Sequence, residues 1–193
     1  MVKQFLTKYR FVVYCGGGAL ARNYQKAAST VTKASYDLDL VGIYATWLNA
    51  CLVRIILKEF ATEKVIIDPT KRVNFKKVVV AAGWKPGWST DYDAVLLAKK
   101  LNCKRIINIT NVDYLYDKDP TKFKDAKPIK QISWNEFIEL IKCEWKPGLS
   151  SPFDPLAAQK AKELKIKVII IGKDMNNFKT LLEGNKFKGT IIS

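Results

Sequence analysis

Apolar positions along the chain alternate between short continuous runs and longer stretches with helical spacing. The short runs, which are rich in β-branched residues and have the length of strands, lie at residues 10–15, 64–67, 77–82, 105–109 and 166–171. Residues 19–29, 36–60 and 91–101 between them favour helices. In the longest of these, apolar side chains recur at steps of three and four, which predicts one apolar helix face: Leu38, Val41, Ala45, Leu48, Leu52 and Ile55.

Capping residues predict two further helices. Ser133 is expected as the N-cap of one, because Glu136 stands three residues later, at the second position of a capping box. Asp154 is expected as the N-cap of the other, with Pro155 in the first helical position. Residues 189–193 are interpreted as a final edge strand. Strands that alternate with helices predict an α/β fold, a three-layer αβα sandwich with a largely parallel central sheet.

Length and composition bound the class of protein. The chain has 193 residues, no Pro/Gly/Ser-rich linker and no internal repeat, which predicts a single domain over residues 1–193. An apolar fraction of 48% excludes a disordered protein. No apolar run reaches the roughly 18 residues of a membrane span, and the first ten residues lack the apolar core of a signal peptide. We therefore expect a cytoplasmic protein without a membrane segment.

The absence of histidine excludes several kinds of site. There is no histidine and none of the four cysteines forms a CxxC pair, so a Cys/His zinc site and Ser-His or Cys-His catalysis are ruled out. The net charge of +15 is interpreted first as a lysine-rich solvated surface, and attraction of ligands that carry phosphate is the alternative. Because the lysines are scattered, without a run of five, nucleic-acid binding rests on the charge alone and is not predicted.

A glycine turn at residues 16–18 follows the first strand and precedes a helix. Glycines permit positive φ and let backbone N–H groups approach an anion closely, and the helix amino terminus adds its dipole. Arg22, one turn into the helix, adds a guanidinium group. The turn therefore predicts a phosphate site. Its spacing fits neither a Walker A loop nor GxGxxG, so a purely structural tight turn stays an alternative.

Two more polar segments follow strands, at residues 83–91 (GWKPGWSTD) and 110–120 (TNVDYLYDKDP). Ligands of open α/β sheets bind beyond the carboxyl ends of the strands, where both segments and the glycine turn are expected. Ser89 and Thr90 are candidates to cap the following helix, and a capped loop without a ligand stays an alternative. Trp84 and Trp88 need partners, which a planar base or a subunit interface would supply.

Taken in order, the segments GGGALARNY, DLVGIYATWLNA, GWKPGWSTD, TNVDYLYDKDP, PFDPLAA and GTII resemble the UMP kinase family of the amino-acid kinase superfamily, in particular its archaeal-type branch. The resemblance covers most of the chain, and TNVDxxYxxDP is its most specific motif. It implies an αβα sandwich that transfers the γ-phosphoryl group of ATP to UMP in pyrimidine biosynthesis. It also implies Mg²⁺ held mainly through nucleotide phosphates, and a homo-oligomer, usually a hexamer.

The resemblance also assigns site residues by matching position. The residues matched to UMP binding are Gly17, Asp39, Trp84, Lys85, Pro86, Gly87, Trp88, Ser89 and Thr90, and those matched to ATP binding are Gly18, Arg22, Thr110, Tyr116 and Asp119. Arg22 and Asp113 are the candidate catalytic residues, and no side chain is assigned to a metal. Phosphoryl transfer relies on positioning and electrostatic stabilisation, so it needs no histidine.

The chain departs from the family pattern at three places. Relatives begin with a strand and a glycine loop that carries a phosphate-binding lysine, so we expect this chain to be truncated at its amino end by about one strand-helix unit, roughly 30 residues. Tyr92 and Asp93 look like an insertion after the STD motif, and Gln159 stands where relatives often have lysine. The first departure supports an alternative function, a nucleotide-binding regulatory homologue that has lost phosphoryl transfer.

Overall fold

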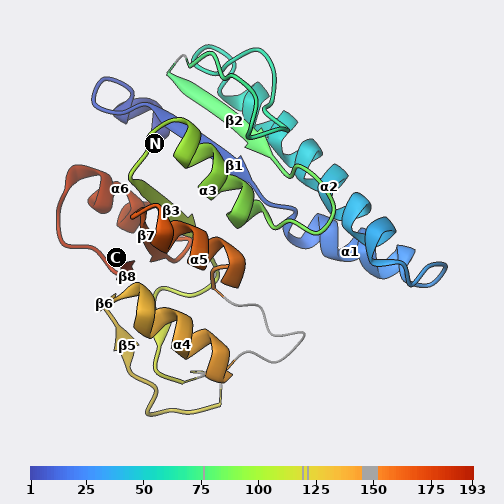
Figure 1. Cartoon of the computed structure of the whole chain (residues 1–193). Helices are drawn as coiled ribbons and strands as arrows, with labels where there is room; N and C mark the ends of the chain where they lie inside the picture. Colours follow the sequence, from blue (N-terminus) through green and yellow to red (C-terminus); the bar gives the residue numbers. More distant parts are fainter. Residues whose placement is uncertain (76, 119, 121, 145–151) are drawn as a thin grey trace. The chain divides into compact units, whose positions relative to one another are not determined.

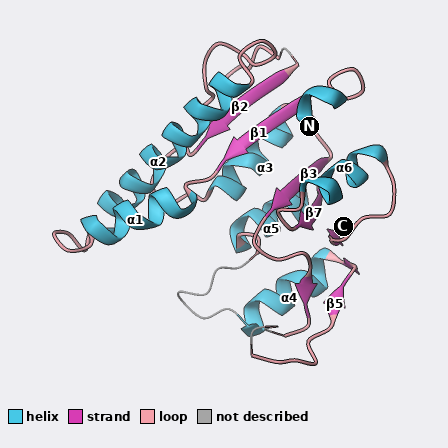
Figure 2. Ribbon diagram, turned by 180° about the vertical axis from the view of Figure 1, so that it is seen from behind, coloured by secondary structure: helices cyan, strands magenta, loops and turns pink. Residues whose placement is uncertain are grey.

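The computed structural model describes residues 1–75, 77–118, 120, 122–144 and 152–193. These residues form two compact units, Val2–Leu97 and Ala98–Ser193, the latter with Met1, and each is described by itself. The single-domain organisation stays a prediction. Strands paired mostly in parallel alternate with helices, as the apolar pattern predicts (Figure 2).

The first unit is built on two parallel strands. Its elements are a short 3-10 helix η1 (Val2–Phe5), β1 (Phe11–Cys15), α1 (Gly18–Ala28), α2 (Ser35–Ile56), β2 (Val78–Ala82) and the start of α3 (Thr90–Lys100). β1 and β2 pair from Phe11 opposite Val78 to Cys15 opposite Ala82. α2 packs on both strands and on α1 (Figure 1). The carboxyl ends of both strands therefore lie side by side, each followed by glycine.

The core under α2 uses small helix residues. Ala45, Thr46 and Ala50 are buried, and Ala50 packs against β2, all of whose residues are inaccessible to solvent. The predicted apolar face is wrong for its second half, because Leu48, Leu52 and Ile55 are 63, 58 and 54% exposed. The helix approaches the sheet closely through small side chains, which turns the larger ones outward.

α2 is long and apolar enough to cross a bilayer, judged by length and composition alone. The charged residues Asp37, Asp39 and Arg54 interrupt its apolar sequence, so α2 contains no continuous apolar run of that length. Its packing on α1, β1 and β2 makes it a helix of the folded unit.

The strand predicted at residues 64–67 is not formed as a strand. Only isolated bridges join this region to β2, between Ala61 and Val78 and between Ile66 and Ala81. Pairing stops because the chain turns at Asp68, whose Oδ1 accepts the backbone N–H of Thr70 at 2.9 Å.

The second unit contains a mixed sheet with strand order β3-β7-β8-β6 and a separate antiparallel pair β4-β5. Its elements are β3 (Arg105–Ile109), β4 (Leu115–Tyr116), β5 (Pro128–Ile129), β6 (Gln131–Ile132), α4 (Trp134–Glu144), α5 (Pro155–Glu163), β7 (Lys167–Ile171), α6 (Met175–Glu183) and β8 (Thr190–Ile192). β3 and β7 are parallel, as are β6 and β8. β8 is not the predicted edge strand: it runs antiparallel to β7 and is covered on its other side by β6.

The predicted caps of this unit are confirmed. The amide and hydroxyl of Ser133 donate to Glu136 Oε2 at 2.9 and 2.6 Å, which forms the capping box of α4. Asp154 Oδ1 accepts the N–H of Ala157 at 2.8 Å. Helix α6 was not predicted, although Asp174 caps its start and Gly184, with φ of 86°, ends it.

Candidate functional site

The glycine turn joins β1 to α1. Gly18 has φ of 57°, in the left-handed region, so this position favours glycine. Gly17 is the N-cap of α1 and supplies no side-chain cap, and the first turn of the helix has no acidic residue. The first N–H groups of a helix lack intrahelical acceptors, so this end suits an anion. Arg22 lies exposed one turn further along.

Asn49 of α2 holds the turn in place. Its Nδ2 donates to the carbonyl oxygens of Gly16 and Gly17, at 2.8 and 3.2 Å. Thr90 lies beside the same turn, since its Oγ1 is 3.9 Å from the position of a Cβ on Gly16. The sequence analysis missed Asn49, whose only signal is an amide side chain within an apolar helix.

The second segment, residues 83–90, is called here the tryptophan loop, and α2 anchors it. The N–H of Gly83 donates to Thr46 Oγ1 at 2.8 Å, and Trp47 Nε1 donates to the Gly83 carbonyl at 2.7 Å. Asp39 Oδ2 accepts the N–H of Gly87 at 2.7 Å, at a position where φ is 82°. The structure therefore brings Asp39 together with the tryptophan loop, two parts of the predicted UMP site that lie far apart in the sequence.

The indoles of the loop pack on each other and on neighbouring side chains. The ring centroids of Trp84 and Trp88 are 5.5 Å apart, and those of Trp88 and Tyr92 are 4.3 Å apart. Lys85 Nζ lies 4.1 Å from the Trp84 centroid and 4.8 Å from that of Trp88. Pro86 is half-buried and Trp88 is 37% exposed. The structure gives both tryptophans partners within the loop and the start of α3, whereas the sequence analysis named a planar base or a subunit interface. Trp88 keeps surface for a planar ligand.

Ser89 and Asp93 organise the start of α3. Ser89 Oγ accepts the N–H of Tyr92 at 3.1 Å, so Ser89 caps the helix and Thr90 is its first residue. Asp93 is completely buried, and its Oδ2 accepts the N–H of Trp84 at 3.0 Å. Burial raises the pKa of Asp93 to about 6, against the opposing effects of the Trp84 N–H and of Lys85.

The buried carboxyl of Asp93 makes stability depend on pH. The carboxyl of Asp93 binds a proton more tightly in the folded protein than in the unfolded chain. Protonation of Asp93 therefore contributes its full stabilisation below the ordinary pKa of 3.8, and this stabilisation is lost as the pH rises through about 6. We expect Asp93→Asn to raise the free energy of unfolding at pH 8 by about 1–3 kcal/mol and to match the wild type near pH 4. Urea unfolding across this range measures the difference, and a constant difference would contradict it.

The third segment follows β3 in the second unit. The N–H of Thr110 donates to the Ile171 carbonyl at 2.9 Å, which continues the pairing of β3 with β7. Asp113 lies against Gly172, the residue after β7: a Cβ on Gly172 would be 1.9 Å from Asp113 Oδ1. The carboxylate of Asp113 can occupy this position only because residue 172 is glycine and has no side chain. Sequence analysis missed it because glycine after a strand is common.

The rest of this segment is hydrogen-bonded to β8 of the mixed sheet through Thr190. Thr190 Oγ1 accepts the N–H of Leu115 at 2.8 Å and donates to the Ile129 carbonyl. Tyr116, in β4, is half-buried, with its ring centroid 6.5 Å from that of Tyr114. The predicted ATP residue Asp119 lies outside the described residues.

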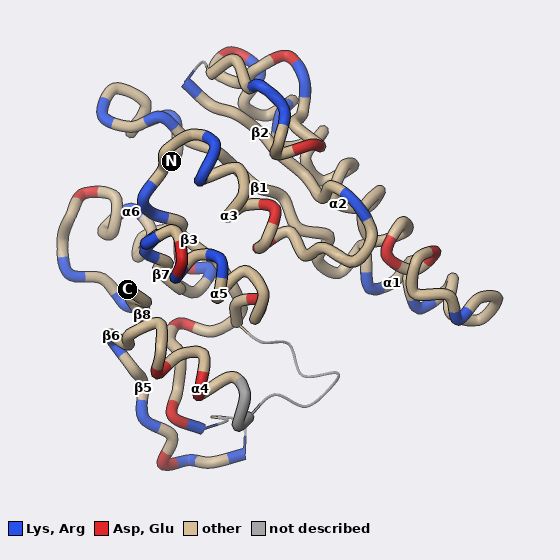
Figure 3. Tube along the Cα trace, in the orientation of Figure 1, with Lys and Arg blue, Asp and Glu red and all other residues tan. Residues whose placement is uncertain are grey.

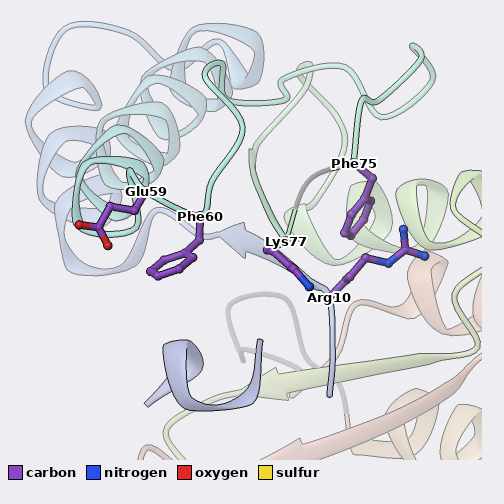
Figure 4. A pocket seen from close by; sticks show the side chains of 5 residues that line it. All are labelled: Arg10, Glu59, Phe60, Phe75 and Lys77. Atoms are coloured by element: carbon purple, nitrogen blue, oxygen red, sulfur yellow. The ribbon is translucent and has the colours of Figure 1, made fainter. Parts of the chain in front are cut away.

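A hollow of about 410 Å³ lies elsewhere in the first unit, lined by Arg10, Glu59, Phe60, Phe75 and Lys77 (Figure 4). Arg10 and Lys77 immediately precede β1 and β2, so the hollow is at the amino ends of these strands, opposite the glycine turn. The Arg10 guanidinium carbon lies 4.9 Å from the Phe75 centroid. Among the residues predicted for nucleotide binding, none of those that the structure describes lines the hollow.

Metal-binding groups do not cluster in the described part of the chain. No three Cys, Asp or Glu side chains there come together in an arrangement that could hold a metal ion. Lysine and arginine are spread along the elements of both units (Figure 3).

Comparisons with known proteins agree with this arrangement. The sequence profile described as "Amino acid kinase family" matches residues 1–172. The uridylate kinase of Thermococcus sibiricus is 37% identical over 190 residues, which cover 95% of this chain and 84% of the relative. That of Methanobrevibacter smithii is 32% identical over 198 residues, covering 100% and 88%.

The crystal structure of uridylate kinase from Archaeoglobus fulgidus matches all of this chain and 88% of its own, with a TM-score of 0.85 and 31% identity. This likeness confirms the predicted αβα fold. The chain belongs to the amino acid kinase family, in the branch formed by the archaeal uridylate kinases.

Proposed function

We propose that this chain is a UMP kinase, which transfers the γ-phosphoryl group of ATP to UMP and yields ADP and UDP. The observation that carries the proposal is the joint anchoring of the glycine turn and the tryptophan loop by α2: Asn49 binds the first, and Asp39 binds the second. Such an assembly places an anion site next to aromatic and hydroxyl groups that suit a nucleoside.

In this proposal the first unit binds the acceptor. The N–H groups of Gly17 and Gly18 bind phosphate, and Arg22 neutralises the charge that develops on the transferred group. The carboxylate of Asp39 accepts hydrogen bonds from the ribose or base of UMP, while its Oδ2 keeps Gly87 in place. Residues 84–90 enclose the acceptor.

The second unit contributes the ATP residues other than Gly18 and Arg22, which belong to the first unit. Thr110, Tyr116 and Asp119 are assigned to ATP binding, and Asp113 to the catalytic end of the same segment. Mg²⁺ would be held mainly by the phosphate oxygens of ATP and would spread the negative charge of the phosphates. The protein's own contribution is to bind and orient each substrate.

An assay of ADP release tests the proposal, with UMP, CMP, acetylglutamate and isopentenyl phosphate offered in turn. Turnover with UMP is expected. Activity on acetylglutamate or isopentenyl phosphate, without activity on UMP, would overturn the assignment of the acceptor. Calorimetry that detects UMP or UTP binding without any turnover would favour the regulatory homologue instead.

We further infer that the protein is cytoplasmic and forms a homo-oligomer, for which the family resemblance suggests a hexamer. The support is an apolar stripe on α2 whose side chains are between 54 and 63% exposed: Tyr44, Leu48, Leu52, Ile55 and Ile56. Contiguous exposed apolar side chains at helical spacing are typical of an interface. A second copy of the same stripe is a suitable partner, because two-fold contacts place identical surfaces together.

The double substitution Leu48→Lys with Leu52→Lys is expected to shift the protein to a smaller species, because it places charges inside the inferred interface. Light scattering coupled to gel filtration measures the mass. Leu156→Lys is a matched control, since Leu156 is 61% exposed and lies on α5. An unchanged mass in the double variant would exclude this stripe as the interface.

A further inference from the structure

We propose that Asp93 is a positioning residue of the tryptophan loop: from inside the first unit it fixes the backbone of Trp84 and so sets the loop conformation that receives the acceptor nucleotide. The identity of that nucleotide rests on the proposed function. The proposal itself concerns a side chain to which the family resemblance assigns no role.

Asp93 ties both ends of the loop. Its Oδ2 accepts the N–H of Trp84 at 3.0 Å, and its own N–H donates to the Ser89 carbonyl at 3.0 Å. One residue of α3 thus closes the segment between Trp84 and Ser89, and the bond from Gly87 to Asp39 fixes its tip from α2. A loop closed in this way has few conformations left, which is how a binding surface becomes preorganised.

The burial of Asp93 is not explained by packing. Its side chain is completely inaccessible, yet among the described residues Oδ1 has no hydrogen-bond partner. The hydroxyl of Tyr14, on β1, is buried without a partner as well. An apolar side chain would fill this space at lower cost, because a buried carboxyl with an unsatisfied oxygen is destabilising. Within the described residues, the hydrogen bond from Trp84 is a polar interaction of this carboxylate that an apolar residue could not replace.

The charges around Asp93 link it to the surface of the loop. Tyr14 faces it from β1, and burial followed by the charge of Asp93 raises the pKa of that phenol well above its ordinary value. Lys85 faces it from the loop and lowers the pKa of Asp93, while Asp68 acts on Tyr14. Since Lys85 also lies over both indoles, the charge on Asp93 affects the side chains that would contact the acceptor.

Steady-state kinetics of the full chain separate this role from simple stability. In Asp93→Ala the Trp84 N–H loses its acceptor, so we expect KM for UMP to rise roughly tenfold or more, with kcat and KM for ATP little changed. Asp93→Asn keeps an acceptor oxygen in the same place and is expected to restore KM to near the wild-type value. A wild-type KM in Asp93→Ala, or an Asn variant as impaired as the Ala variant, would overturn the proposal.

The pH profile gives a second readout. The phosphate of UMP titrates near pH 6 itself, so the quantity of interest is the ratio of KM values between the wild type and Asp93→Asn. This ratio is expected to be near one at pH 5, where Asp93 is protonated, and to depart from one at pH 8 by much less than the change that Asp93→Ala causes. In the control Asp174→Asn, which alters an exposed carboxylate that likewise accepts a backbone N–H, the corresponding ratio is expected to stay flat. A flat ratio for Asp93→Asn would count against the proposal.

Tryptophan fluorescence tests the loop without any substrate. The wild type is expected to show an emission change with a midpoint near pH 6, which Asp93→Asn abolishes and Asp174→Asn keeps. If the wild type does not act on UMP, the proposed function fails, but the fluorescence still decides whether Asp93 controls the loop. Identical titrations in the wild type and Asp93→Asn would refute that control.

Discussion

Arg22→Ala is expected to lower kcat for UMP phosphorylation roughly 100- to 1000-fold, while the variant folds normally. Arg22 is exposed on α1, one turn from the glycine turn, in a helix whose first turn has no acidic residue. Its guanidinium is therefore available for the phosphates, and its removal takes away a charge that is most needed when the phosphoryl group moves. Initial rates with saturating ATP and UMP measure the effect.

Two variants control the Arg22 prediction. Arg22→Lys keeps the charge but not the planar fork, so an intermediate loss is expected. Arg72→Ala removes an exposed arginine from the loop before β2 and is expected to behave as the wild type. If Arg22→Ala retained kcat within threefold of Arg72→Ala, Arg22 would have no catalytic role.

Gly172→Ala is expected to reduce kcat by roughly 10- to 100-fold, because the reacting groups tolerate displacements of less than about 1 Å. The added methyl group would lie 1.9 Å from Asp113 Oδ1 and 3.1 Å from Asp113 Cγ, so the carboxylate must move. The same crowding should lower the free energy of unfolding by about 1–3 kcal/mol.

Gly184→Ala separates the kinetic effect of Gly172→Ala from the stability effect. Gly184 ends α6 with φ of 86°, and a Cβ there would meet no atom within 4 Å. Alanine at this position strains the backbone by roughly 1 kcal/mol and leaves Asp113 undisturbed. If Gly172→Ala and Gly184→Ala had the same kcat, the position of the Asp113 carboxylate would not affect turnover.

The elements set by local chemistry were predictable. β3 begins and ends at the predicted residues, Arg105 and Ile109, because a short run rich in isoleucine favours a strand. The caps at Ser133 and Asp154 follow from side-chain geometry within four residues. Errors arose where tertiary packing decides. Whether Leu48 faces the core, and whether β8 lies at an edge, depends on partners distant in sequence.

The same division holds for the candidate site. The glycine turn and the tryptophan loop could be predicted from the sequence, because their residue types suit phosphates and nucleosides. Asn49, Asp93 and Gly172 could not, because each acts through contacts outside its own helix or strand. Asn49 contacts Gly16 and Gly17, Asp93 contacts Trp84, and Gly172 lies against Asp113. Asp93 looked like part of an insertion, whereas the structure makes it the closure of a loop.

The hydrogen bonds of Thr190 can form only at the end of synthesis of the protein. The Thr190 hydroxyl joins Leu115 and Ile129, residues that are translated 75 and 61 positions earlier. Contacts of such long range form late, and a ribosome adds residues at about 5–20 per second, so the segment assigned to ATP waits several seconds for the residue that completes it. Until then a nascent chain with its glycine turn already folded has no finished second unit. We expect ATP to protect newly made chains from proteolysis only after β8 has been synthesised.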